Sequence, residues 1–161
     1  MIPEPTAAGV LAALRARGAT LATAESLTGG MLAARLVDVP GASAVFRGGL
    51  VAYATDLKAT LVGVESALLD RLGPVAGEVA AALAEGARQR CGADWGLGTT
   101  GVAGPDPQDG KPAGTVFIGV AGPGGAPAVR ELHLTGDRPA IRAATVDAVL
   151  SLLAERLTAE R

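Results

Sequence analysis

The sequence predicts an α/β fold, a single-domain α/β/α sandwich built on a mixed sheet. Short apolar segments with strand character alternate with segments whose apolar residues recur at helical spacing, a pattern typical of a layered α/β domain. Near the end of the chain, two apolar segments are joined by the turn Gly122–Gly125, which predicts a hairpin and so an antiparallel part of the sheet. Neither a repeat nor a linker interrupts this pattern, so residues 1–161 are expected to form one domain.

The first half of the chain is expected to alternate short helices with strands. Val10, Leu11 and Leu14 lie on one face of the first helix, and Gly18 ends it. An apolar segment then leads directly into a Thr-Gly-Gly turn, which predicts a strand followed by a second helix. In chain order we expect a helix over Thr6–Arg17, a strand over Ala19–Ala24, a helix over Thr28–Val37, a turn over Ala42–Phe46, a strand over Gly48–Ala54, and short helices over Asp56–Leu61 and Glu65–Leu72.

The second half is expected to contain two long helices and the hairpin. Val79, Leu83 and Ala87 recur at helical spacing in the first of these helices. Asp137 is the expected N-cap of the last helix, and Pro139 suits the first helical position. In chain order we expect a helix over Val75–Cys91, a strand over Ala93–Thr99, a loop rich in Gly, Pro and Asp over Thr100–Ala113, strands over Thr115–Ala121 and Ala128–Leu134, and a helix over Pro139–Leu157.

Composition excludes several classes of function. The net charge is −2, and no cluster of basic residues with interleaved aromatics appears, so nucleic acid is a poor candidate ligand. The longest uncharged run, Pro112–Val129, is broken by Pro and Gly, which argues against a membrane helix. Met1–Pro5 lacks the basic start of a signal peptide, and a single cysteine, Cys91, allows no intrachain disulfide. We therefore expect a cytoplasmic protein with no membrane or nucleic-acid partner.

The segment Thr23–Gly30 is the first candidate site, because it places Ser26 at an expected strand-to-helix junction. Backbone N–H groups at such junctions are unpaired and can bind anions. Ser26 or Thr28 could simply cap the following helix. Alternatively, Ser26 could be a nucleophile or an anion anchor, although Ala24 and Thr28 occupy the glycine positions of the α/β-hydrolase nucleophile elbow. The spacing alone leaves both interpretations open.

A base for Ser26 is not expected to be histidine. The one histidine, His133, alternates with Leu132 and Leu134 on a late strand and is expected to be a surface or cross-strand residue. Of 14 Lys and Arg residues, only Lys58 and Lys111 are lysines. A desolvated lysine can lose its proton and arginine cannot, so Lys58 is the candidate base, although chance could also place a lysine there. Tyr53, the one tyrosine, could join Lys58 in holding a water or a serine hydroxyl.

Three further features bear on ligand binding. The residues Gly96–Gly101 match the letter of a dinucleotide-binding G-x-G-x-x-G, but a Pro-rich loop follows instead of a helix, so we reject that function; the glycines suit a strand end where the backbone approaches a ligand. The loop Thr99–Pro105 offers N–H groups and hydroxyls to a phosphate or carboxamide, unless it is an ordinary turn. Arg138 and Arg142 place cations in the first turns of a helix, where they oppose the dipole and could hold an anion. No metal-ligand spacing is found.

Taken together in this order, several motifs resemble the C-terminal domain of the CinA family, which also occurs alone as nicotinamide-nucleotide (NMN) amidohydrolase. Any one of them is weak, but five in register across nearly the whole chain are specific. The matching segments are Ala24-Glu25-Ser26 with Thr28-Gly29-Gly30, Gly49–Tyr53 with Lys58 and Gly63-Val64, Thr100–Pro105, Lys111–Val116 and Gly136-Asp137-Arg138.

The resemblance implies a hydrolase that deamidates NMN to nicotinate mononucleotide and ammonia in pyridine-nucleotide recycling, without a cofactor or metal. It implies Ser26 as nucleophile, Lys58 as general base and Tyr53 as an orienting partner. It also suggests a homodimer. The residues it implies for substrate binding are Glu25, Thr28, Gly29, Gly30, Thr100, Gly101, Ala103, Gly104 and either Arg138 or Arg142; the N–H groups of Thr28 to Gly30 are the expected oxyanion donors.

The chain departs from the usual family pattern at three places. Leu27 follows the serine where the family usually has Cys, and Val75-Ala76-Gly77 stands where Val-Ser-Glu is usual. Gln108-Asp109-Gly110 precedes Lys111 where a Glu-Lys-Pro run is more usual. These departures keep a second hypothesis open, a nucleotide- or partner-binding module whose catalysis has decayed, related to competence- or damage-inducible CinA proteins.

Overall fold

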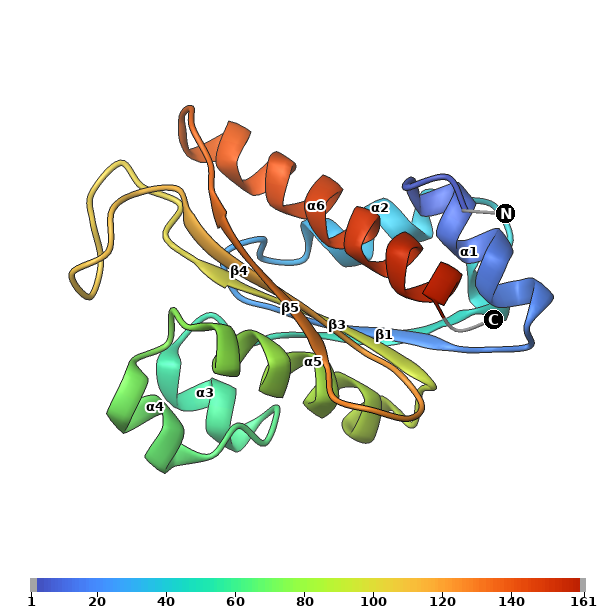
Figure 1. The fold of residues 1–161 in the computed structure, drawn as a ribbon, viewed down its shortest axis with the longest axis horizontal. Helices are drawn as coiled ribbons and strands as arrows, with labels where there is room; N and C mark the ends of the chain where they lie inside the picture. Colours follow the sequence, from blue (N-terminus) through green and yellow to red (C-terminus); the bar gives the residue numbers. More distant parts are fainter. Residues whose placement is uncertain (1–2, 160–161) are drawn as a thin grey trace.

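The fold is organised around a mixed five-stranded sheet, seen in a computed structural model that describes residues 3–159 (Figure 1). The strand order is β2-β1-β3-β4-β5. β1 runs parallel to both β2 and β3, whereas β4 is antiparallel to both of its neighbours, β3 and β5, which confirms the mixed sheet and the hairpin. The strands are β1 (Leu21–Glu25), β2 (Phe46–Val51), β3 (Trp95–Gly101), β4 (Thr115–Ala121) and β5 (Ala128–His133).

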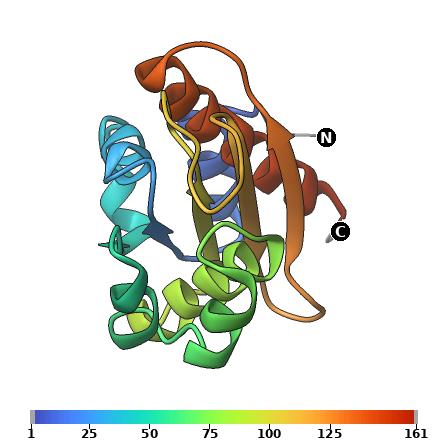
Figure 2. The ribbon, with the colours of Figure 1, turned by 90° about the vertical axis from the view of Figure 1, so that its left-hand side faces the viewer.

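Helices cover both faces of the sheet and make the predicted α/β/α layers (Figures 1 and 2). One layer contains the mutually contacting helices α1, α2 and α6, and the other contains α5 with the short helices α3 and α4. The helices are α1 (Ala7–Ala16), α2 (Met31–Val37), α3 (Thr55–Thr60), α4 (Ser66–Leu72), α5 (Gly77–Cys91) and α6 (Arg138–Ala159), with a 3-10 turn η1 (Ala42–Ala44) before β2.

The glycines of β3 have a packing role that the sequence did not suggest. A Cβ at Gly96 would lie 2.0 Å from the main-chain oxygen of Ala84, and one at Gly98 would lie 2.5 Å from that of Ala80. Gly119 on β4 meets the same Ala80 oxygen at 2.5 Å. These glycines therefore let α5 lie directly on the sheet, so Gly96 and Gly98 serve helix packing and not the approach of a ligand.

The observed boundaries differ from the predicted ones where glycine or a distant partner intervenes. α2 begins at Met31 and not at Thr28, because Gly29 and Gly30 have φ of +57° and +102°, which no helix interior allows. α5 begins at Gly77 after the extended residue Ala76. β2 includes Phe46 and ends at Val51, and pairing with β4 extends β3 to Gly101.

The start of α6 has the cap that the sequence predicted. Asp137 Oδ1 accepts a hydrogen bond of 3.0 Å from the N–H of Ala140, which confirms Asp137 as the N-cap of α6.

Within residues 3–159, no helix combines the length and apolar character needed to cross a membrane. The same residues contain no group of three His, Cys, Asp or Glu side chains placed to share a metal ion.

Candidate active site

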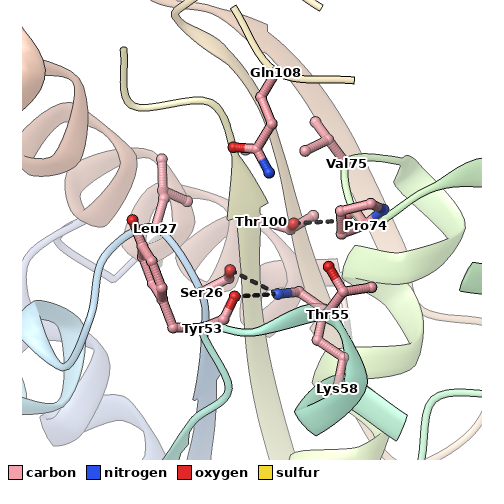
Figure 3. Close-up of a pocket in the computed structure, with 10 residues that line it drawn as sticks. Ser26, Leu27, Tyr53, Thr55, Lys58, Pro74, Val75, Thr100 and Gln108 are labelled. Carbon is pink, nitrogen blue, oxygen red and sulfur yellow. Dashed lines mark hydrogen bonds between the residues drawn. The ribbon is translucent and has the colours of Figure 1, made fainter. Parts of the chain in front are cut away.

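The candidate site lies where β1 and β3 end side by side. Ser26 directly follows β1, Thr100 and Gly101 end β3, and Lys58 lies on α3, just after the neighbouring strand β2. The carboxyl ends of adjacent parallel strands are a common place for ligand sites in α/β sheets. The cavity there is lined by Ser26, Leu27, Tyr53, Thr55, Lys58, Pro74, Val75, Thr100, Gly101 and Gln108 (Figure 3).

Ser26 and Lys58 are in direct contact at the floor of this cavity. Lys58 Nζ lies 2.9 Å from Ser26 Oγ (Figure 3), and Ser26 and Lys58 are only 7% and 1% exposed. The two residues are 32 positions apart in sequence and are joined by the β1–α2–β2–α3 connection. The structure therefore forms the serine–lysine pair that the sequence could suggest only from the scarcity of lysine.

Two main-chain carbonyls fix the orientation of the Lys58 amine. Nζ donates to the oxygen of Ala52 at 2.9 Å and to that of Tyr53 at 3.1 Å. A neutral amine has two hydrogens and one lone pair, and carbonyl oxygens can only accept. When the two hydrogens point to Ala52 and Tyr53, the lone pair is left for the remaining direction, which is that of Ser26 Oγ.

The surroundings of Lys58 favour its neutral form. Burial lowers the pKa of Lys58 from its ordinary value of 10.5 to about 8, because desolvation penalises the ammonium. Among the described residues, no carboxylate lies within 4.0 Å of Nζ to oppose this effect, and no acidic residue lines the cavity. Lys58 can therefore both accept and return a proton near neutral pH.

Glu25 holds the turn from the other side of Ser26. Its buried carboxylate accepts from the N–H of Leu32 at 2.8 Å and from that of Ala33 at 3.1 Å, in the first turn of α2. Gly30, the N-cap of α2, has no side chain to do so. Glu25 does not line the cavity, so its expected place among the substrate contacts is corrected: its carboxylate caps a helix.

The main chain of the Ser26 turn is tied to β3 by hydroxyls and amides. The Ser26 N–H donates to the Thr99 oxygen at 3.0 Å, and Thr28 Oγ1 lies 2.8 Å from Thr99 Oγ1. The Gly29 N–H donates to the Ser26 oxygen at 3.0 Å, which removes it from the expected oxyanion donors. Thr28 is fully buried, so its hydroxyl serves the turn and is not offered to a ligand.

Tyr53 contributes to the site differently from the expected orienting role. Its carbonyl binds Lys58, but its phenol oxygen accepts a 2.9 Å hydrogen bond from Arg138 and makes no hydrogen bond to Ser26 or Lys58. The Tyr53 ring stands at the cavity wall beside Leu27 (Figure 3). Arg138 also donates to the Gly104 oxygen at 2.7 Å and so joins the Tyr53 side of the cavity to the loop after β3.

Arg142 is the second expected anion-binding arginine, and it holds the Ser26 turn. Its Nε donates to the Leu27 oxygen at 2.9 Å and its Nη2 to the Thr28 oxygen at 3.0 Å. Neither Arg142 nor Arg138 lines the cavity, and neither forms an ion pair with a carboxylate among residues 3–159. Both guanidinium groups therefore lie beside the site without a paired carboxylate among the described residues.

Of the other residues singled out in the sequence, some line the cavity and some lie elsewhere. Thr100 and Gly101 line the cavity as expected, with the Thr100 hydroxyl donating to the Pro74 oxygen at 2.6 Å. Ala103 is 6% exposed and belongs to the buried hydrophobic core, which corrects its expected substrate contact. His133 is exposed and pairs with Glu131 at 2.7 Å on β5, which confirms it as a surface residue.

Sequence reasoning did not select several residues that line the cavity. Thr55 is the first residue of α3, Pro74 and Val75 lie in the segment that leads into α5, and Gln108 comes from the loop after β3. The unusual residues Gln108-Asp109-Gly110 were the one signal for Gln108. Val75 belongs to the unusual segment Val75-Ala76-Gly77. For Thr55 and Pro74 no sequence motif was available, because they reach the site only in the folded chain.

Comparison with known proteins agrees with this architecture. A CinA-like protein of Frankia casuarinae is 56% identical over 148 residues, and one of Anaeromyxobacter is 50% identical over 153 residues. These alignments cover 92% and 93% of this chain but 34% and 37% of the relatives, so the chain spans about a third of their length.

Solved structures of the same superfamily have the same fold over almost the whole chain. A CinA superfamily protein from Klebsiella pneumoniae superposes with a TM-score of 0.90 at 33% identity and covers 96% of both chains. The competence/damage inducible protein CihA from Agrobacterium tumefaciens superposes with a TM-score of 0.89 at 33% identity, over 94% of this chain and 93% of its own. A family model described as the CinA C-terminal domain matches residues 3–157. The chain therefore belongs to the CinA family, as a copy of the family's C-terminal domain.

Proposed function

We propose that this domain is a serine amidohydrolase that converts nicotinamide mononucleotide to nicotinate mononucleotide and ammonia. The observation that carries the proposal is the 2.9 Å contact between Lys58 Nζ and Ser26 Oγ, in a buried site where the pKa of Lys58 is lowered to about 8. An amide is hydrolysed by an activated nucleophile, a proton for the leaving amine and donors for the oxyanion. The first two are met by Ser26 and Lys58.

The proposed reaction has two steps. Lys58 takes the proton of the Ser26 hydroxyl while Oγ bonds to the carboxamide carbon; Lys58 then returns that proton to the nitrogen as the C–N bond breaks and ammonia leaves. Water then attacks the Ser26 ester while Lys58 takes one proton from that water. Lys58 gives this proton to Ser26 Oγ as the C–O bond breaks, which releases nicotinate mononucleotide and restores the serine hydroxyl. With the Ser26 and Gly29 N–H groups occupied and Thr28 fully buried, the proposed oxyanion donor among these residues is the N–H group of Gly30.

The charge at the rim of the site supports an anionic substrate. Arg138 and Arg142 bind carbonyl oxygens at one side of the cavity and have further N–H donors on each guanidinium. Because none of the described residues that line the cavity is acidic, a phosphate that approaches these arginines meets positive charge with no carboxylate paired to it. We propose these arginines as the phosphate contacts. Cytoplasmic location and the homodimer stay predictions.

Ammonia release from NMN by the purified domain tests the proposal. We expect turnover by the wild type, and loss of roughly a thousandfold or more in Ser26→Ala. The matched control is Ser43→Ala, an exposed serine in η1 outside the cavity, which is expected to keep full activity. Equal ammonia release by wild type and Ser26→Ala would contradict the serine mechanism.

A second candidate function is a nucleotide-binding module without catalysis. The observation that favours it is the start of α5, where Ala76 gives no side-chain cap and Gly77 stands where the family usually has Glu. Glu78, the next acidic residue, is exposed and does not line the cavity. Calorimetric binding of NMN without ammonia release would support this module, and turnover at ordinary enzyme rates would exclude it.

A further inference from the structure

Gln108 is the one residue of loop 102–114 that reaches the cavity, among the residues that the structure describes. Figure 3 shows its side-chain amide directed into the cavity, above Ser26 and beside Thr100 and Val75. The inference drawn from it rests on the proposed function and concerns which pyridine substituent the site prefers.

The backbone at Gln108 is fixed although the residue is exposed. Its N–H donates to the Lys111 oxygen at 3.0 Å, and the Lys111 N–H donates back to the Gln108 oxygen at 2.9 Å. Asp109 and Gly110 between them have φ of +51° and +74°, the left-handed pair of a tight two-residue turn. The side chain therefore starts from a defined point at the top of the cavity.

The tip of the loop lies close to the segment that enters α5. Asp109 Oδ2 is 3.9 Å from the position of a Cβ built on Gly73, directly before the cavity residues Pro74 and Val75. At the base of the same loop, Arg138 binds the Gly104 oxygen. The tip and the base of the loop are thus both placed against other parts of the fold, and this arrangement holds Gln108 over Ser26.

The polar groups around Gln108 are mostly occupied. Lys58 makes three hydrogen bonds, Thr100 donates to Pro74, and the Tyr53 phenol accepts from Arg138. Within residues 3–159, the side-chain amide of Gln108 makes no hydrogen bond to another protein group. It therefore offers an unused acceptor and donor to a ligand placed between it and Ser26.

We propose that Gln108 is a specificity-determining residue that hydrogen-bonds the carboxamide of the substrate through its side-chain amide. A carboxamide presents an N–H donor and a carbonyl acceptor, and Gln108 presents the complementary pair. The carboxylate of the product presents acceptors only and can use one half of that pair. Among the described residues none that lines the cavity is acidic, so a single substitution at Gln108 brings a negative charge toward that carboxylate.

The test uses Gln108→Ala and Gln108→Glu, with Asp109→Asn as the matched control in the same turn. Asparagine tolerates the left-handed conformation of residue 109, and position 109 does not line the cavity. The hydrogen bonds at position 108 come from the main chain, so neither substitution removes a contact of the fold. Kinetics are measured with NMN, and binding of NMN and nicotinate mononucleotide is measured by calorimetry in the non-reactive Ser26→Ala background.

We expect Gln108→Ala to raise the KM for NMN roughly threefold to tenfold, the range for one hydrogen bond, with kcat within about twofold of wild type. Gln108→Glu is expected to weaken the binding of nicotinate mononucleotide by about tenfold or more, and the binding of NMN by no more than about threefold. Both ligands have the same phosphate, so the difference between the two changes reports on the group at the ring. Asp109→Asn is expected to change each constant by less than about twofold.

Two results would overturn the inference while leaving the proposed function intact. One is normal KM and binding in both Gln108 variants while the wild type hydrolyses NMN. The other is a fall in kcat at unchanged KM, because this would place the effect of Gln108 in the transition state and not in substrate selection. If the wild type neither binds nor hydrolyses NMN, the proposed function is wrong and the inference fails with it.

Discussion

Glu25 and Lys58 are buried charged side chains on two sides of Ser26, each 1% exposed, and they are held in opposite ways. Glu25 accepts two N–H groups at the positive end of α2, so its charge is compensated by the helix that it caps. Lys58 is held by two neutral carbonyls and has no carboxylate within 4.0 Å among the described residues. The comparison separates a charge that stabilises the fold from one that the fold leaves poised for proton transfer.

The largest expected effect separates activity from stability at Lys58. In Lys58→Met we expect NMN hydrolysis to fall by roughly a thousandfold, because the base is lost. The free energy of unfolding at pH 7 is expected to stay within about 1 kcal/mol of wild type or to rise, because removing a desolvated ammonium offsets the loss of two hydrogen bonds. Urea denaturation and ammonia release measure the two effects.

Lys58→Arg sharpens this prediction, because arginine keeps the charge and cannot act as a base at accessible pH. We expect it to be as inactive as Lys58→Met. Substantial activity in Lys58→Arg would show that a positive charge, and not proton transfer, is what the site needs from residue 58.

The next largest effect is expected at Glu25, where a substitution changes the stability of the protein. Glu25→Ala removes two charge-assisted hydrogen bonds and leaves two N–H groups of α2 unpaired, so we expect the free energy of unfolding to fall by about 2–4 kcal/mol. Urea denaturation gives this value directly. Asp147→Ala, which breaks an exposed pair with Arg35, serves as a control and is expected to have a much smaller effect. An unchanged stability in Glu25→Ala would refute the structural role of this carboxylate.

The pH dependence follows from the lowered pKa of Lys58, about 8 in the folded protein against 10.5 ordinarily. Below pH 8 the base is protonated, so kcat/KM is expected to fall about tenfold for each pH unit below it and to level off above it. The free energy of unfolding is also expected to rise with pH. Between about pH 8 and 10.5 the unfolded chain binds a proton that the native protein has released, so unfolding becomes harder as pH rises, by at most on the order of 3 kcal/mol.

Lys58→Met is the control for both pH effects, since it has no group that titrates at this position. Unfolding of wild type and variant is compared from pH 7 to pH 10, and the difference between them is expected to grow in favour of wild type. A constant difference over this range would mean that the pKa of Lys58 is not lowered.

The smallest expected effect concerns the cap that α2 has and α5 lacks. Ala76 is the extended N-cap residue of α5 and makes no side-chain hydrogen bond. Ala76→Ser is expected to stabilise the protein by about 0.5–1 kcal/mol. Thermal unfolding measures the gain, and kcat for NMN is expected to stay unchanged because Ala76 does not line the cavity. A large rise in kcat would instead assign the missing hydroxyl to catalysis.

Much of the fold could be predicted because it depends on local patterns. The order and type of the elements, the mixed sheet and the cap at Asp137 all follow from periodicity and turn residues that are close in sequence. The start of α2 was predicted three residues early, at Thr28, because the left-handed conformations of Gly29 and Gly30 depend on how the Ser26 turn is tied to its surroundings.

The candidate site could be predicted only in part. Ser26 and Lys58 were selected from residue types that suit the chemistry, and the structure brings them together. The family resemblance implied Glu25 and Ala103 as substrate contacts, yet their side chains serve α2 and the core. Tyr53 lines the cavity, but its phenol binds Arg138 and does not orient Ser26 or Lys58. Neighbours in sequence point to different sides of a strand or turn, so adjacency does not place a side chain in a site.

The sequence by itself determined the layers of this protein and the serine and lysine of the candidate site. Tertiary structure alone decided which groups meet. Arg142 binds Leu27 across 115 positions, Arg138 binds Tyr53 across 85, and Gln108 enters the cavity from a loop that no periodicity describes. The physical reason is that hydrogen-bond partners and desolvation are properties of distant segments packed together, and the pKa of Lys58 is set by that packing.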